Sequence, residues 1–272
     1  MGSLLGSIVG ISDSLYLLLN GLAGRSWLFD TLVTLAIDNN LVKAAPLCAA
    51  FLFVWYAVGD EAAVRRRRRV LMVTVGSLFV VLAASKTMGD HIFLPRPFIQ
   101  SERVYHVEGG KLVQTVPLAY RTPLAGSPQG RFERLGAGEI EENDLASFPS
   151  DHAAFFFALA LGIFLASRRA GAFAIAWVLV AIAGSRMITG THTPLDIAGG
   201  IAIGGTILLA AQFVAGRWLR GLLDRIAGWT LLYPALSAAL VFLMMFEVGN
   251  SLDNLRDLAR TARHIVENFV GG

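Results

Sequence analysis

The chain has 272 residues, of which 55% are hydrophobic and only 16% are charged. Its mean hydropathy of +0.59 is far above that of an ordinary soluble domain, so the composition excludes a soluble globular protein and favours a membrane protein. The formal net charge of +3 is small, and a single cysteine excludes an internal disulfide framework and a cysteine-based metal site.

Residues 3–24 form the first apolar segment. No cationic region precedes it and no A-x-A cleavage site follows it, so we expect no removable signal peptide. The segment contains several polar residues, namely Ser7, Ser12, Asp13, Ser14 and Asn20. These predict an interfacial helix, with a seventh membrane span as the alternative.

Six further apolar stretches approach the length needed to cross a hydrocarbon core of roughly 30 Å. They cover residues 42–59, 70–88, 152–168, 171–189, 195–216 and 228–248. We therefore predict an all-α fold, a polytopic membrane bundle of about six transmembrane helices that forms a single domain over residues 1–272.

Basic residues gather in three connections between these spans, as Arg65–Arg69, as Arg168 and Arg169, and as Arg217, Arg220 and Arg225. A basic run can bind nucleic acid, but between apolar spans it is typical of cytoplasmic loops. We expect no nucleic-acid partner, and the alternation of the spans places residues 90–151 and 189–194 together on the outer face.

Two segments extend beyond this bundle. Residues 98–147 form a long outer-face insert in which Val104–Val107 and Leu112–Val116 flank Glu-Gly-Gly-Lys, a pattern typical of a β-hairpin. The insert could be a lid or a solvated loop without a special role. Residues 250–272 carry apolar residues at helical spacing and predict a C-terminal amphipathic helix on the membrane surface.

Polar clusters stand at the predicted outer ends of the spans. Ionisable residues near apolar segments are costly to keep, so the candidate functional residues are His152, Arg186, His192 and Asp196. A neutral imidazole can attack phosphorus, and a carboxylate that binds its other ring nitrogen fixes the tautomer. With Thr193 as N-cap and Pro194 as the first helical residue, Asp196 can fold back toward His192. Alternatively, Asp196 merely caps the helix.

A second histidine can act as general acid toward the leaving oxygen and later as base toward water. His152 fits this role because it begins a predicted helix whose free N–H groups form an anion site. Ser150 can cap that helix or donate its hydroxyl to phosphate. We expect Asp151 to point away from the phosphate or to cap the helix.

Arg96 and Arg186 offer planar guanidinium groups, which suit the charge that develops on equatorial phosphate oxygens. Each alone could be an interfacial anchor. Two arginines and two histidines at one predicted depth indicate phosphoryl-transfer chemistry.

These residues resemble the motifs of the type 2 phosphatidic acid phosphatase (PAP2) superfamily, which also contains the vanadium haloperoxidases. The family patterns are K-x6-R-P, P-S-G-H and S-R-x5-H-x3-D. The third is complete from Ser185 to Asp196, the second has Asp151 in place of glycine, and the first keeps Arg96-Pro97 but has Gly89 at the lysine position.

The resemblance implies that His192 is the nucleophile, Asp196 its orienting partner and His152 the general acid. It implies that phosphate is held by Arg96, Ser150 and Arg186, and that neither a metal nor a cofactor is needed. Lys86 lies about one helical turn before Gly89. It could replace the missing lysine or snorkel to the interface. His91 and His106 match no motif and are expected at the surface.

The segments Phe-Pro-Ser-Asp-His and Pro-Arg-Pro-Phe are similar to the bacterial undecaprenyl-diphosphate phosphatase branch. This similarity implies a lipid diphosphate substrate at the outer face of a bacterial plasma membrane. The alternatives are hydrolysis of phosphatidic acid or phosphatidylglycerol phosphate, transfer of phosphate to another lipid, and non-catalytic binding or translocation of a lipid phosphate. Binding alone has no use for a nucleophile with an orienting carboxylate, and a soluble haloperoxidase is disfavoured by the apolar spans.

Overall fold

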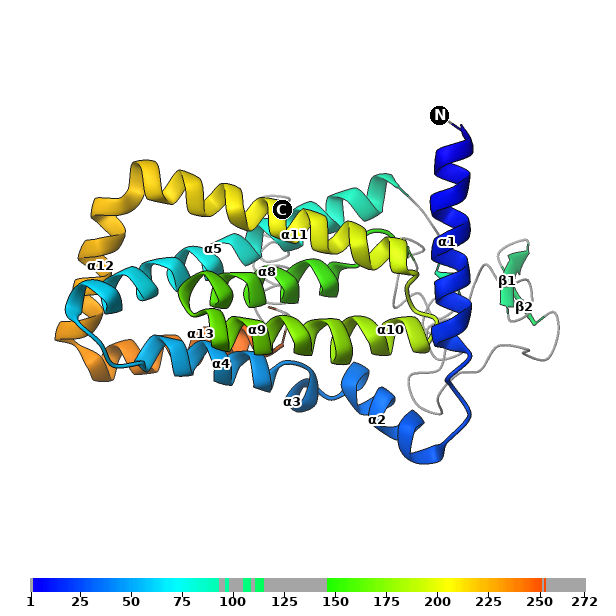
Figure 1. Ribbon diagram of the computed structural model, residues 1–272, viewed down its shortest axis with the longest axis horizontal. Coiled ribbons are helices and arrows are strands. Elements are labelled where there is room, and N and C mark those ends of the chain that lie inside the picture. The colour runs from blue at the N-terminus through cyan, green and yellow to red at the C-terminus, as the bar shows by residue number, and fades with distance from the viewer. Residues whose placement is uncertain are drawn as a thin grey trace, which may run out of the picture.

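The computed structural model describes residues 2–92, 96–97, 105–108, 111–114, 146–250 and 252. These residues form a helical bundle (Figure 1) and one β-hairpin, in which β1 (Tyr105–Glu108) pairs antiparallel with β2 (Lys111–Gln114). The predicted all-α class and the predicted hairpin are confirmed. Apart from residues 146 and 147, the rest of the outer-face insert lies outside the described residues, as does nearly all of the predicted C-terminal helix.

The helices follow the chain in a simple order. They are α1 (Gly2–Asn20), α2 (Trp27–Asp38), α3 (Asn40–Lys43), α4 (Ala45–Tyr56), α5 (Glu61–His91), α8 (Asp151–Ala166), α9 (Arg168–Trp177), α10 (Ser185–Ile188), α11 (Pro194–Val214), α12 (Arg220–Leu232) and α13 (Pro234–Gly249). Two π-helical segments join neighbouring helices, η2 (Val178–Gly184) between α9 and α10, and η3 (Ala215–Leu219) between α11 and α12.

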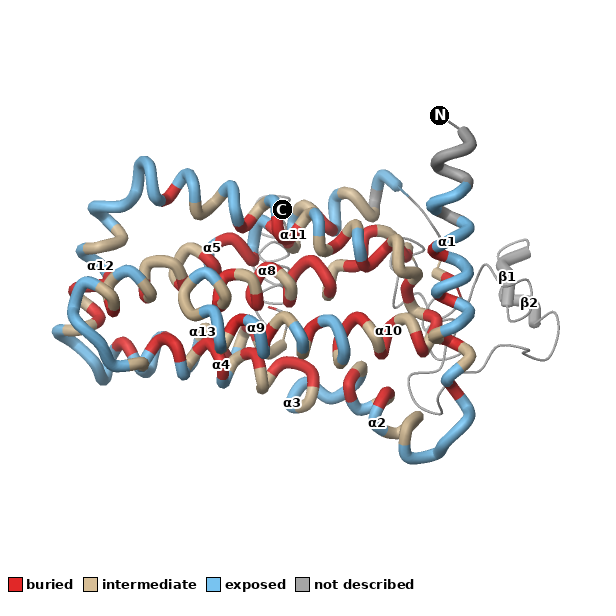
Figure 2. Tube along the Cα trace, in the orientation of Figure 1, coloured by how far each residue is buried: buried red, intermediate tan, exposed pale blue. Residues whose placement is uncertain are grey.

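Helix α8 lies at the centre of the bundle, packed against α5, α9 and α11. Its large side chains are buried on several faces, among them Phe155, Phe156 and Ile163. Figure 2 shows the buried positions along α8 and along the inward faces of its neighbours. The outer helices instead expose large apolar side chains such as Phe213 and Phe242, as expected for a bundle surrounded by lipid.

Three helical stretches are long and apolar enough to cross a membrane, namely Glu61–Gly89, Arg168–Ile188 and Pro194–Leu232. Three shorter apolar helices accompany them, Ala45–Tyr56, Asp151–Ala166 and Pro234–Gly249. Each predicted span overlaps one of these six helices. The number of helices that cross the membrane remains a prediction.

The first predicted span, 42–59, starts too early and ends too late. The apolar helix α4 begins at Ala45, after the separate short helix α3, and ends at Tyr56. Asn39 caps α3 by accepting hydrogen bonds from the backbone N–H groups of Leu41 and Val42. Lys43 therefore belongs to a capped turn that precedes the apolar helix.

The basic run Arg65–Arg69 lies inside α5 and not in a loop as predicted. Asp60 begins this helix by accepting a hydrogen bond from the backbone N–H of Ala63 at 2.8 Å. The N-cap comes before the arginines, so the whole run is helical.

The last predicted span, 228–248, is also wrong at its start. Tyr233 has φ −122° and ψ 67°, outside the helical region, and separates α12 from α13. The ring of Pro234 disfavours helical backbone in the residue before it, so residues 228–232 end α12 and the shorter helix α13 follows.

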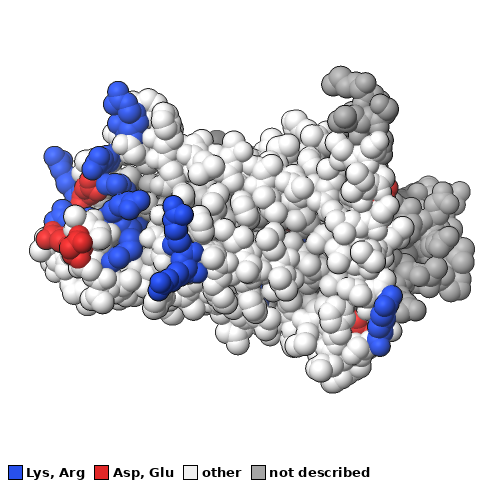
Figure 3. Space-filling view, viewed as in Figure 1, with Lys and Arg blue, Asp and Glu red and all other residues white. Residues whose placement is uncertain are grey.

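The basic clusters of α5 and α12 meet at one end of the bundle, where Figure 3 shows most of the visible blue surface. Arg69 Nη1 lies 2.6 Å from Asp224 Oδ1, and Arg68 Nη1 donates to Thr230 Oγ1 at 2.8 Å. The last turn of α5 and the first turns of α8 and α11 lie at the opposite end.

Helix α1 runs across that opposite end (Figure 1). Its Ser12 hydroxyl accepts a hydrogen bond from the backbone N–H of Leu195 at 3.2 Å, and Asn20 Nδ2 donates to the carbonyl of Ile188 at 2.8 Å. Ser12 and Asn20 are two of the polar residues that argued against a membrane span at residues 3–24. In the structure they bind both sides of the connection between α10 and α11.

Candidate active site

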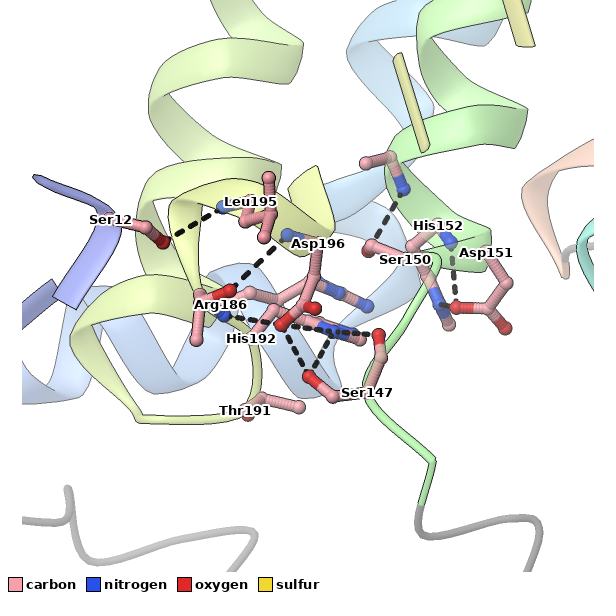
Figure 4. A network of polar contacts seen from close by, with 12 residues as sticks. Ser12, Ser147, Ser150, Asp151, His152, Arg186, Thr191, His192, Leu195 and Asp196 are labelled. Carbon is pink, nitrogen blue, oxygen red and sulfur yellow. Dashed lines mark hydrogen bonds and ion pairs between the residues drawn. The ribbon is translucent and has the colours of Figure 1, made fainter. Parts of the chain in front are cut away.

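Three separate stretches of the chain converge at the end of the bundle covered by α1. They are Arg96, the segment Ser147–His152 that leads into α8, and the segment from Arg186 to Asp196. The charges of Arg96, Arg186, Asp151 and His152 all act on His192. Figure 4 shows the last two stretches with their side chains turned toward one another. The predicted convergence of two histidines and two arginines is therefore present.

The chain reverses sharply between α10 and α11, and this turn brings His192 beside Arg186. Gly190 has φ 71°, in the left-handed region that favours glycine. The carbonyl of Arg186 then accepts hydrogen bonds from the backbone N–H groups of Thr191 at 2.9 Å and His192 at 3.2 Å. The S-R-x5-H spacing thus corresponds to a short helix followed by one closed turn.

The ring of His192 is almost completely buried and its orientation is fixed. Its Nδ1 lies 2.9 Å from the carbonyl oxygen of Ser147, and its side chain is 2% exposed. A carbonyl can only accept a hydrogen bond, so Nδ1 carries the proton in the neutral ring. The lone pair of that tautomer is on Nε2, the atom that could attack phosphorus.

Asp196 takes part in a capping box at the start of α11. Its Oδ2 accepts from the backbone N–H of Thr193 at 2.6 Å, and its own N–H donates to Thr193 Oγ1 at 3.2 Å. Oδ2 is 4.0 Å from Nδ1 of His192, too far for a direct hydrogen bond. The hydroxyl of Ser147 instead donates to the Asp196 carboxylate. Asp196 therefore caps α11, as the alternative prediction proposed, and it is also linked to His192 indirectly through Ser147.

The surroundings of His192 keep its imidazole neutral. Burial, followed by the positive charges of Arg96 and Arg186, holds the pKa of His192 well below its usual value. The negative charge of Asp151 opposes this shift. Near neutral pH the ring therefore has the free lone pair that a nucleophile needs.

His152 has a carboxylate partner that we did not predict. Its Nδ1 lies 2.8 Å from Oδ1 of Asp151, where we expected Asp151 to point away or to cap the helix. The residue that replaces the family glycine can thus fix the tautomer of His152, and its charge favours the imidazolium form against the stronger opposing effects of burial and Arg186. Ser150 caps α8 instead, because its Oγ accepts a hydrogen bond from the backbone N–H of Ala153 at 3.4 Å.

A backbone contact holds the two histidine-bearing segments together. The N–H of Ser150 donates to the carbonyl of Asp196 at 3.1 Å. Arg186 is buried beside them and Arg96 is half-buried. Lys86 is exposed on α5, and among the described residues no hydrogen bond or ion pair joins its side chain to this cluster. Its predicted phosphate contact remains a prediction.

Sequence reasoning missed Ser147, Asp151 and Lys43. Ser147 acts through its carbonyl as well as its hydroxyl, and a backbone group leaves no mark in a motif. The signal for Asp151 was its place next to a histidine at the start of a helix. Lys43 is far away in sequence, and only the folded chain brings its charge into range of Arg186 and Asp151.

The sequence model of the PAP2 superfamily matches residues 70–219. This stretch is more than half of the chain and contains both histidines, both arginines and Asp196. The chain belongs to the PAP2 superfamily. This family membership makes it a phosphoric ester hydrolase, and its apolar helices make it an integral membrane protein.

The chain is also similar to two curated proteins. The chain is 28% identical over 218 residues to a protein of Escherichia coli (strain K12) named "Putative undecaprenyl-diphosphatase YbjG", covering 79% of this chain and 88% of the relative. It is 36% identical over 107 residues to the Bacillus licheniformis "Bacitracin transport permease protein BcrC", covering 39% of this chain and 46% of the relative. No solved structure matches the chain.

Proposed function

We propose that this PAP2 protein removes the terminal phosphate of a lipid diphosphate, with undecaprenyl diphosphate as the preferred substrate, through a covalent intermediate on His192. The observation that carries the proposal is the hydrogen bond from His192 Nδ1 to the Ser147 carbonyl. This bond leaves Nε2 unprotonated, within range of the charges of Arg96 and Arg186.

In the first step, Nε2 of His192 attacks the terminal phosphorus and forms a P–N bond. The bond from that phosphorus to the bridging oxygen breaks, and its electron pair leaves with the lipid monophosphate. His152 gives its proton to this oxygen as general acid. Asp151 stabilises the imidazolium form of His152 before the transfer.

In the second step, water attacks the phosphorus of the intermediate and the P–N bond breaks. His152, now neutral, takes a proton from the water as general base. Inorganic phosphate leaves and His192 returns to its starting form. Arg96, Arg186 and Ser150 stabilise the charge on the equatorial oxygens in both steps.

We propose that the active end faces the outside of a bacterial plasma membrane. The arginines of α5 and α12 lie at the other end of the bundle, where the positive-inside rule favours the cytoplasm. Six helices would then cross the bilayer as one domain, with α1 lying along the outer interface. A lipid diphosphate can present its head group at this depth while its chain remains in the bilayer.

The relatives support this substrate class without fixing it. One relative is named as a diphosphatase of undecaprenyl lipid, which favours hydrolysis. The other is named as a transport permease, which keeps the non-catalytic alternative of lipid-phosphate binding or translocation. Phosphatidic acid or phosphatidylglycerol phosphate hydrolysis, and phosphate transfer to another lipid, would use the same residues.

The proposal is tested with purified protein in detergent and a measurement of released phosphate. Undecaprenyl diphosphate, phosphatidic acid and phosphatidylglycerol phosphate are offered separately. We expect the highest kcat/KM on the diphosphate, and we expect His192→Ala to lower kcat by at least about a thousandfold. The matched control is His91→Ala, which replaces an exposed histidine at the end of α5.

Two results would count against the proposal. Preference for phosphatidic acid would remove the diphosphate assignment but keep the phosphatase. Binding of all three lipids without phosphate release would favour the non-catalytic alternative. In each case a monodisperse elution profile for both histidine variants shows that the protein is folded.

A further inference from the structure

Lys43 is a buried cation that the reaction above does not use. It ends the short helix α3, and only 7% of the residue is exposed. Its carbonyl accepts a hydrogen bond from Nε1 of Trp177 at 3.3 Å. The capped turn at Asn39 and this contact to α9 fix the backbone from which the lysine side chain extends.

The ammonium group of Lys43 lies among charges of the active site. Arg186 and Asp151 both act on it, as does Asp38 of α2. No described residue accepts a hydrogen bond from its Nζ. A buried ammonium is costly unless an anion accompanies it, and Asp151 is already hydrogen-bonded to His152. A phosphate group bound beside Lys43 would supply a counterion.

The ionisation of Lys43 is consistent with this role. Burial, and after it the positive charge of Arg186, lowers its pKa to about 8, while Asp151 and Asp38 oppose the shift. The side chain is still largely protonated near neutral pH. A bound phosphate would favour the charged form further.

The position of Lys43 indicates which phosphate it would meet. Its charge acts on His152. Lys43 thus lies within electrostatic range of His152, the group that we propose protonates the leaving oxygen. In a diphosphate, that side of the site holds the phosphate that stays with the lipid.

We propose that Lys43 binds the leaving-group phosphate of a diphosphate substrate and so makes the site prefer diphosphates to single phosphate groups. The proposal rests on the function proposed above. The family lysine position is occupied by Gly89 in this chain, so α5 presents no cation there. Helix α3, outside the matched residues 70–219, supplies one instead.

The test compares Lys43→Met with the wild-type full-length protein in detergent. We expect KM for undecaprenyl diphosphate to rise about 10- to 100-fold, the range for loss of one hydrogen bond to a charged group. Inhibition by vanadate, which occupies only the position of the transferred phosphate, should change less than about threefold. Arg25→Met removes an exposed cation as a control, and its KM should equal that of the wild type.

A second variant keeps the test independent of folding. In the wild type, KM for the diphosphate should rise as pH increases through about 8, because Lys43 loses its proton there. Arginine stays charged, so Lys43→Arg should remove this rise. The assignment is overturned if KM of both variants equals the wild-type value. It is also overturned if Lys43→Met weakens inhibition by vanadate as much as it raises KM for the diphosphate. It is also overturned if Lys86→Met raises KM while Lys43→Met does not. An inactive wild type would instead count against the proposed function.

Discussion

Oδ2 of Asp196 lies 4.0 Å from Nδ1 of His192, and Ser147 connects the two residues. Its hydroxyl donates to the Asp196 carboxylate, while its carbonyl accepts from the imidazole at 2.9 Å. Asp196 is therefore linked to His192, the proposed nucleophile, only through Ser147 and makes no direct hydrogen bond to it. The carboxylate also holds the first turn of α11, so it connects the loop that carries His192 to the bundle.

This relationship predicts different effects for the two residues. Ser147→Ala keeps the carbonyl and should lower kcat about tenfold, corresponding to one lost hydrogen bond. Asp196→Ala should lower kcat further and reduce stability by about 1 kcal/mol, because it also removes the bond to the Thr193 N–H. Steady-state kinetics and thermal unfolding measure the two effects. Equal kinetic effects, with no loss of stability in Asp196→Ala, would show that the carboxylate acts on His192 alone.

The contact between Asp151 and His152 predicts a dependence on the leaving group. Asp151→Asn removes the charge that stabilises the imidazolium, so proton donation to the leaving oxygen should weaken about 10- to 100-fold. A substrate such as p-nitrophenyl phosphate needs no proton donor and should be much less affected. The ratio of kcat values on the lipid and aryl substrates measures this. A uniform loss on both substrates would assign Asp151 to another role.

The lowered pKa of His192 predicts the acid side of the pH profile. Protonation of Nε2 removes the attacking lone pair, so activity is lost as pH falls through that pKa. Since the pKa lies well below the usual histidine value, kcat/KM should persist below pH ~6.5. Arg96→Gln removes a repelling charge, and the acid limb should move to higher pH even though overall activity falls. An acid limb that stays in place would mean that another group controls it.

The close approach of α8 and α11 predicts a stability effect at Gly204. A Cβ there would lie 2.1 Å from the Ala154 carbonyl oxygen, so Gly204→Ala must push the helices apart. We expect a loss of about 1–3 kcal/mol and a lower kcat, because α8 carries His152. Gly216→Ala is the matched control, since its Cβ would meet nothing within 4 Å. Thermal inactivation in detergent compares the two, and equal midpoints would contradict the packing argument.

The sequence allowed prediction of those features that depend on local spacing. Hydrophobic stretches located the helices, and the S-R-x5-H-x3-D pattern located a turn that closes on the carbonyl of Arg186. Boundaries were less predictable where capping decides them. Asp60 begins α5 before the arginine run, and Pro234 divides the last apolar stretch.

The parts of the site that could not be predicted depend on tertiary packing. Lys43 comes within range of Arg186 because α2 packs against α10 and α4 packs against α8 and α9. Nothing in the residues around Lys43 indicates this. Likewise, the pattern that suggested a direct bond between His192 and Asp196 contains no sign that Ser147 connects them.

The proposed covalent bond between His192 and phosphorus can be tested by the stereochemistry of hydrolysis. A lipid diphosphate whose terminal phosphorus is made chiral with sulfur and an oxygen isotope is hydrolysed in water carrying a second oxygen isotope. Two successive in-line displacements, first by His192 and then by water, predict net retention of configuration in the released thiophosphate. Net inversion would show that water attacks the lipid diphosphate directly and that no phosphohistidine intermediate forms.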